Sequence, residues 1–155
     1  MSRAFVKEDG DAPPPPPLER AVSAAPNRVT PRGLRLIDEE IVRLEAALGA
    51  GQDADIEAQL RRDLRYWTAR RASAQPVPHA PEPREAGFGA KVTIRRGAAT
   101  QVVEIVGEDE ADPAQGRIGW TSPLARALDG ARPGDTVELG AEPIEVFAVG
   151  AGEGG

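Results

Sequence analysis

The sequence predicts an α+β protein, in which an N-terminal antiparallel α-hairpin precedes a small antiparallel β domain with one short helix. Between residues 30 and 75 the apolar residues recur at helical spacing, whereas after residue 87 they fall into short runs separated by glycine and proline. The 155 residues also include 15 prolines and 17 glycines, too many for one compact domain throughout. We therefore expect a disordered or linker segment as well.

The prolines mark the borders of four segments. Residues 1–29 contain five consecutive prolines, Pro13 to Pro17, which favour an extended conformation and predict a disordered tail. Residues 30–75 carry the hairpin, and residues 76–86, with four prolines, read as a linker. Residues 87–150 hold the predicted β domain.

The hairpin begins with Thr30, a candidate N-cap, and Pro31 at the first helical position. Apolar residues then follow at alternating spacings of three and four, the a/d pattern of a short coiled coil: Leu34, Ile37, Ile41, Leu44 and Leu48. Glycines at 49 and 51 end this helix. A second helical run, with Ile56, Leu60, Leu64 and Trp67, continues to about Ala74.

The β domain is predicted from five short runs rich in β-branched residues. A short helix, Pro123 to Leu128, follows Ser122 and is closed by Gly130. The runs are 91–95, 100–106, 117–120, 136–139 and 144–149.

Composition excludes several functions. The chain has no cysteine, which removes disulfides, thiolate zinc sites and cysteine nucleophiles. Its single histidine, His79, lies among prolines and is expected to be an exposed linker residue. The net charge of −6 argues against duplex binding through a basic surface. The sequence has no apolar window of about 18 residues, so no membrane span is predicted. The N-terminus does not resemble a secretory signal, and we therefore expect a cytoplasmic protein.

Charged residues on the hairpin allow two interpretations. Asp53, Asp55 and Glu57 lie where the second helix begins, where the helix macrodipole favours acids. They could equally supply ligands to a metal held by another protein. The arginines of the second helix form either a solvated face paired with acids of the first helix or a contact to a nucleic-acid-bearing partner; they are Arg61, Arg62, Arg65, Arg70 and Arg71.

The C-terminal half resembles a known family. The resemblance is carried by residues 105–112 (Ile-Val-Gly-Glu-Asp-Glu-Ala-Asp), by Ile118, by residues 122–128 (Ser-Pro-Leu-Ala-Arg-Ala-Leu), and by Gly130 and Gly134-Asp135. The hairpin borders at residues 30–34 and 74–77 also fit, as does the opening Ser2 to Glu8. Together, about residues 28–150 resemble the GreA/GreB transcription elongation factors, with a GreB-like start.

This resemblance implies an FKBP-like C-terminal domain that docks at the secondary channel of bacterial RNA polymerase through Thr121, Ser122 and Pro123. The coiled coil would reach inward, where tip carboxylates in the family help to hold Mg²⁺ in the polymerase active site. It implies no enzyme activity and no cofactor of the chain's own, and nucleic acid only within the polymerase complex. It also implies no membrane and a monomer.

Two differences from the family bear on the tip. The family's acidic tip sequence is missing, and the hairpin is shorter by about 10 residues per helix, or roughly 15 Å of reach. We therefore expect a Gre-type factor that regulates elongation with weak or no stimulation of transcript cleavage. Two alternatives stay open: cleavage assisted by Asp53, Asp55 or Glu57, and an Rnk-like or other protein-interaction module.

Overall fold

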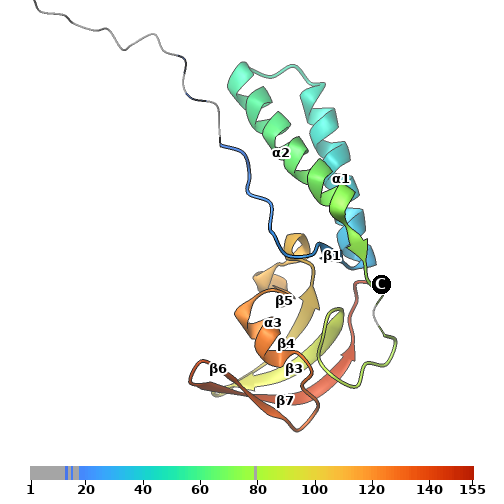
Figure 1. Ribbon diagram of the computed structural model, residues 1–155, viewed down its shortest axis with the longest axis vertical. Coiled ribbons are helices and arrows are strands. Elements are labelled where there is room, and N and C mark those ends of the chain that lie inside the picture. Colours follow the sequence, from blue (N-terminus) through green and yellow to red (C-terminus); the bar gives the residue numbers. More distant parts are fainter. Residues whose placement is uncertain (1–12, 14, 16–17, 79) are drawn as a thin grey trace, which may run out of the picture.

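The computed structural model describes residues 13, 15, 18–78 and 80–155 and has two parts, a helical hairpin and a curled sheet (Figure 1). The GreB-like start at Ser2 to Glu8, His79 and most of the proline run lie outside the described residues. None of the helices in the described ranges combines the length and apolar character needed to cross a membrane.

The hairpin forms as the sequence predicts. Helix α1 spans Pro31–Leu48, and the Thr30 side chain caps it by accepting a hydrogen bond from the Gly33 amide. Helix α2 spans Ala54–Ser73. On α1 the predicted seam faces α2, with Ile37 and Leu44 buried and its other members half-buried. On α2 the only fully buried residue is an arginine, Arg70, so apolar packing alone holds this helix weakly.

Residues 18–29 lie beside α2 and then enter the fold (Figure 1). Strand β1, Arg28–Val29, pairs in parallel with β2, Gln75–Pro76, which directly follows α2. Asn27 is buried, and its side-chain amide donates to the Arg70 carbonyl at 2.7 Å. Residues 18–29, which the sequence places in the disordered tail, are therefore ordered against the hairpin. Their polar groups form hydrogen bonds with the backbone at the C-terminal end of α2.

The second part, residues 86–155, which we call the β domain, is a five-stranded sheet in the order β5-β4-β3-β7-β6. Its strands are β3 Ala90–Arg96, β4 Ala99–Val106, β5 Arg117–Gly119, β6 Thr136–Leu139 and β7 Glu142–Ala151. All pairings are antiparallel except that of β4 with β5. The parallel pair differs from the all-antiparallel expectation because two 3₁₀ turns, η2 (Glu108–Glu110) and η3 (Pro113–Gln115), carry the chain back before β5 begins.

Helix α3, Pro123–Leu128, covers one face of the sheet and has the predicted bounds. Its buried residues Ala125 and Leu128 pack into a core of branched side chains from the central strands. These core side chains include Val92, Ile94, Ile105, Ile144 and Val146. The predicted α+β architecture is thus confirmed.

The hairpin meets the β domain through a buried polar contact, which we call the junction. Arg70, 1% exposed, pairs with Asp109 on η2 and donates to the Asn27 side chain at 2.7 Å. The Tyr66 hydroxyl donates to the same Asp109 carboxylate. Each charge that is buried here therefore has a partner from the other part of the molecule, as burial of an ion requires.

A second cluster of the junction lies at the start of α1. Glu110, 4% exposed, accepts from the Thr30 hydroxyl at 2.6 Å and pairs with Arg32, which also reaches Glu104 at 3.0 Å. The backbones approach closely here, since a Cβ at Gly107 would lie 2.5 Å from the Arg28 carbonyl oxygen. The C-terminal residues join the cluster, because the Arg32 amide donates to the Gly154 carbonyl at 2.8 Å.

The arginines of α2 therefore have different roles. Arg71 pairs with Asp38 of α1 at the surface, as the solvated-face interpretation predicts. Arg61 instead pairs with Glu57 of its own helix. Arg70 is buried in the junction and was not singled out by its position in the arginine run.

Replacing Arg70 tests the junction. Removing one partner of a buried ion pair leaves the other charge unpaired, so Arg70→Ala should lower the free energy of unfolding by about 3 kcal/mol. Arg71→Ala, which removes an exposed pair one residue away, should cost less than about 1 kcal/mol. Urea denaturation followed by circular dichroism measures both, and equal losses for the two variants would contradict a stabilising junction.

Tyr66, the chain's only tyrosine, reports the same contact by its titration. Burial of the phenol, together with its hydrogen bond to the Asp109 carboxylate, raises the pKa of Tyr66 to about 12. Because the folded state favours the neutral phenol, its stabilisation is complete below the ordinary pKa of 10.0 and is lost as pH rises through about 12. Phenolate absorbance should show the raised pKa in the wild type and a lower one in Asp109→Asn. A wild-type pKa near 10 would contradict it.

Candidate functional site

The loop from Gly119 to Pro123 joins the edge strand β5 to α3 and is built by local hydrogen bonds. The Ser122 amide donates to the Gly119 carbonyl at 2.9 Å, which closes a turn. The Ser122 side chain then caps α3 by accepting from the Ala125 amide at 3.4 Å, with Pro123 at the first helical position. Pro123 itself is exposed. Ser122 therefore shapes the loop, and Pro123 is its accessible surface.

Thr121 is engaged within the molecule. Its hydroxyl donates to a Glu108 carboxylate oxygen at 2.7 Å, and Ser23 donates to the same oxygen at 3.1 Å. Glu108 also lies 3.6 Å from the Arg70 guanidinium. Thr121, one of the three residues predicted to bind RNA polymerase, therefore connects the loop to the junction through Glu108.

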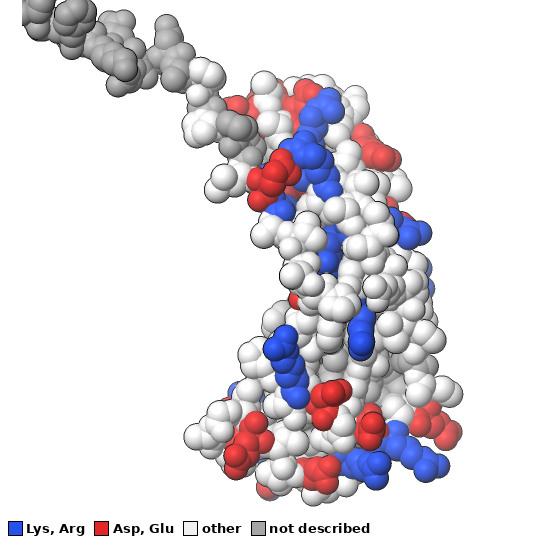
Figure 2. Space-filling view, viewed as in Figure 1, with Lys and Arg blue, Asp and Glu red and all other residues white. Residues whose placement is uncertain are grey.

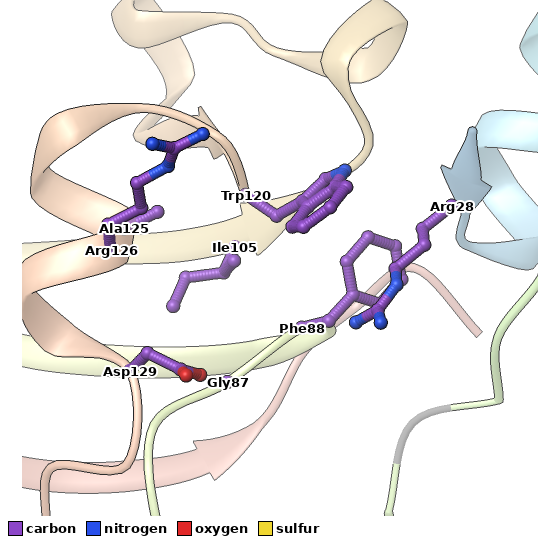
Figure 3. Close-up of a pocket in the computed structure, with 8 residues that line it drawn as sticks. All are labelled: Arg28, Gly87, Phe88, Ile105, Trp120, Ala125, Arg126 and Asp129. Carbon is purple, nitrogen blue, oxygen red and sulfur yellow. The ribbon is translucent and has the colours of Figure 1, made fainter. Parts of the chain in front are cut away.

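A cavity of about 450 Å³ opens beside this loop, between α3 and the aromatic rings of Phe88 and Trp120 (Figure 3). Ile105 lies between the two walls, and Arg126 and Asp129 of the α3 side complete the lining. The Arg28 guanidinium lies 4.8 Å from the centre of the Trp120 ring, a cation–π contact. Because Arg28 comes from β1, the cavity includes a residue of the hairpin side of the molecule.

The tip carboxylates lie at the far end of the hairpin from the β domain (Figure 1). Asp53 caps α2 by accepting from the Ile56 amide at 3.0 Å, and Glu57 pairs with Arg61 at 2.6 Å. Asp55 is exposed in the first turn. Within the described ranges, no three His, Asp or Glu side chains are grouped as metal ligands would be. The structure thus gives Asp53 and Glu57 local partners and brings no metal-binding group together at the tip.

The loop and the tip are separate sites on one molecule, and the junction fixes one relative to the other. The loop and the tip are predictable from the sequence, whereas the junction is not. Arg70 stands out there only as one of the α2 arginines and Asp109 only as part of residues 105–112, and nothing marks Asn27 or Tyr66. One signal was available for two of them, because Tyr66 and Arg70 are four residues apart and share one face of a helix.

The similarity to known proteins is concentrated on the β domain. A family model described as "Transcription elongation factor, GreA/GreB, C-term" matches residues 81–147. The β domain of this chain is similar to the C-terminal domain of the GreA/GreB family. The resemblance seen in residues 105–112 and 122–128 is thereby confirmed. The loop and the cavity-lining residues other than Arg28 lie within the matched residues.

Two curated relatives give the extent of the likeness. Transcription elongation factor GreB of Neisseria meningitidis serogroup A is 46% identical over 100 residues, which cover 59% of this chain and 60% of that protein. Transcription elongation factor GreA of Hyphomonas neptunium is 50% identical over 68 residues, 40% of this chain and 43% of that protein. The chain therefore spans about 60% of the length of the GreB relative and less of the GreA relative.

Among solved structures, the GreA factor homolog 1 (Gfh1) protein of Thermus thermophilus covers 81% of this chain and 99% of its own, with 17% identity and a TM-score of 0.39. A likeness at this level carries no functional argument. The similarity to the GreA/GreB family therefore depends on sequence, through the family model over residues 81–147 and the two curated relatives.

Proposed function

We propose that this protein binds bacterial RNA polymerase through its GreA/GreB domain, docks at the secondary channel and regulates elongation, with weak or no stimulation of transcript cleavage. The match of residues 81–147 to the GreA/GreB C-terminal domain carries this proposal. In it the protein acts as a monomer in the cytoplasm, meets nucleic acid only inside the polymerase complex and has no catalytic site of its own.

The docking surface of this proposal is the loop at Thr121, Ser122 and Pro123. Pro123 is exposed, and the turn and helix cap hold it in one conformation, so little ordering is needed when a partner binds. The loop is also tied to the hairpin through Thr121, Glu108 and the junction. When a partner binds the loop, the orientation of the hairpin relative to that partner is therefore fixed.

The hairpin supports a role in occupying a channel more than a role in supplying metal ligands. With 20 residues, α2 is about 30 Å long at 1.5 Å per residue. Two of the three tip carboxylates already have partners of their own, Asp53 as a helix cap and Glu57 in an ion pair. Catalytic ligands need placement to about an ångström, and a hairpin roughly 15 Å too short does not provide it. Any Mg²⁺ involved would be the polymerase's own.

Changing the docking loop tests the partner. The double variant Ser122→Gly, Pro123→Ala removes the helix cap and the exposed ring, and should weaken binding to core polymerase by at least tenfold, about 1.4 kcal/mol. Pro143→Ala changes an exposed proline beside the sheet edge that lies away from β5, and should leave affinity unchanged. Fluorescence anisotropy of labelled protein measures both. Unchanged affinity in a folded double variant would remove the docking proposal.

Neutralising the tip separates regulation from cleavage. Asp53→Asn, Asp55→Asn, Glu57→Gln removes three charges and keeps a capping side chain at residue 53, so the hairpin should stay folded. We expect little cleavage by backtracked polymerase with the wild type, and polymerase binding by the variant within about threefold, under 1 kcal/mol. Strong cleavage with the wild type that disappears in the variant would support the cleavage alternative instead. No binding by either would favour an Rnk-like or other interaction module.

A further inference from the structure

One side of α2 carries an arrangement that fits a guanidinium. Asp63, Tyr66 and Trp67 are three and four residues apart and therefore share a helix face. The rings of Tyr66 and Trp67 meet edge to face, with centroids 5.2 Å apart and planes at 86°. Aromatic rings beside a carboxylate favour a cation that can stack and pair at once, as arginine does.

Arg20 of the N-terminal segment occupies this site. Its guanidinium carbon lies 3.9 Å from the centre of the Tyr66 ring and 5.5 Å from that of Trp67. One of its nitrogens lies 3.5 Å from the Asp63 carboxylate. The site therefore holds a side chain of the kind its chemistry favours.

The residues before Arg20 are also contacted by α2. Arg65 donates through Nε to both carboxylate oxygens of Glu19, at 3.1 Å each, and Arg62 lies 3.5 Å from the Leu18 carbonyl oxygen. Three consecutive residues thus each meet a different side chain of the helix. Figure 2 shows basic side chains following one another down the visible face of the hairpin, with acidic ones beside them. Such residue-by-residue contacts would fix the position of an extended peptide along the helix.

The contacts of this segment differ in strength along its length. The Glu19 and Arg65 side chains are 61% and 58% exposed, and that of Arg20 is 38% exposed. Exposed ion pairs and cation–π contacts each shift an equilibrium by only about twofold to fivefold. Asn27 and Val29, in contrast, are buried and bonded to the end of α2. Residues 18–24, which we call the strap, can therefore detach while residues 27–29 stay in place.

We propose that Asp63, Tyr66 and Trp67 form a binding site for an arginine side chain presented by a partner protein, and that the strap fills this site with Arg20 until the partner displaces it. The ligand is an extended segment with an acidic residue followed by arginine, the order that Glu19 and Arg20 provide. The site lies on α2 and is separate from the loop at residues 121–123. Its test needs no polymerase, so its outcome is independent of the docking proposal.

A peptide with the sequence of residues 18–24 is the probe for the site. In full-length Arg20→Ala protein the site is vacant, and the peptide should shift the amide NMR signals of residues 63–67 with a millimolar Kd. The wild type should bind it about twofold to fivefold more weakly, because the tethered Arg20 competes at a millimolar effective concentration, close to the Kd of the peptide. A peptide with alanine in place of arginine, and the protein variant Arg20→Ala, Asp63→Asn, should both fail to bind. Equal shifts in wild type and Arg20→Ala would overturn the proposal.

A spin label tests the strap directly. The chain has no cysteine, and Leu18 is 88% exposed, so Leu18→Cys accepts a single label without disturbing the core. The label should broaden the amide signals around Arg62 and Arg65 in the otherwise unchanged protein. Adding Arg20→Ala should relieve at least half of that broadening, whereas adding Arg71→Ala should not. Broadening that is independent of Arg20 would mean that the arginine site does not hold the strap.

Discussion

The Arg70 side chain is buried, so its charge needs a partner inside the fold. It finds its partners only if the hairpin and the β domain sit in one arrangement. Its contacts come from two segments outside α2, with Asp109 on η2 and Asn27 before β1. Charge-assisted hydrogen bonds of this kind are directional. The junction therefore sets the direction of the hairpin, which the sparse apolar surface of α2 would leave undefined.

The C-terminal residues and the start of α1 reinforce that direction. Glu110 is buried by Thr30 and Arg32, and the Gly154 carbonyl accepts from the Arg32 amide. A side chain at Gly154 would place a Cβ 2.9 Å from Thr30, so this close approach needs glycine. Elements that are distant in sequence thus converge on the base of the hairpin, and loss of any one leaves a buried charge or carbonyl without its partner.

Local signals predicted most of the fold. Thr30 with Pro31 and Ser122 with Pro123 start helices, because a capping side chain and a fixed proline φ act within one turn. Long-range features were not predictable in this way. The parallel pairing of β5 depends on where the chain returns after η3, and Arg70 counts as a polar surface residue in any hydrophobic pattern. Residues 18–29 lack apolar periodicity, and their order comes from hydrogen bonds to α2.

The candidate sites show the same division between local and distant causes. Asp53, at the start of α2, fits both a helix cap and a metal ligand in sequence, and the structure gives it the cap. Thr121 fits a partner-binding hydroxyl, yet it donates to Glu108, which lies beside Arg70. Side chains that look available in sequence are thus used to hold the junction and the helix ends. The accessible surface of α2 then depends on weaker, exposed contacts such as those of Arg20. The orientation of the helix depends instead on the buried contacts of Arg70.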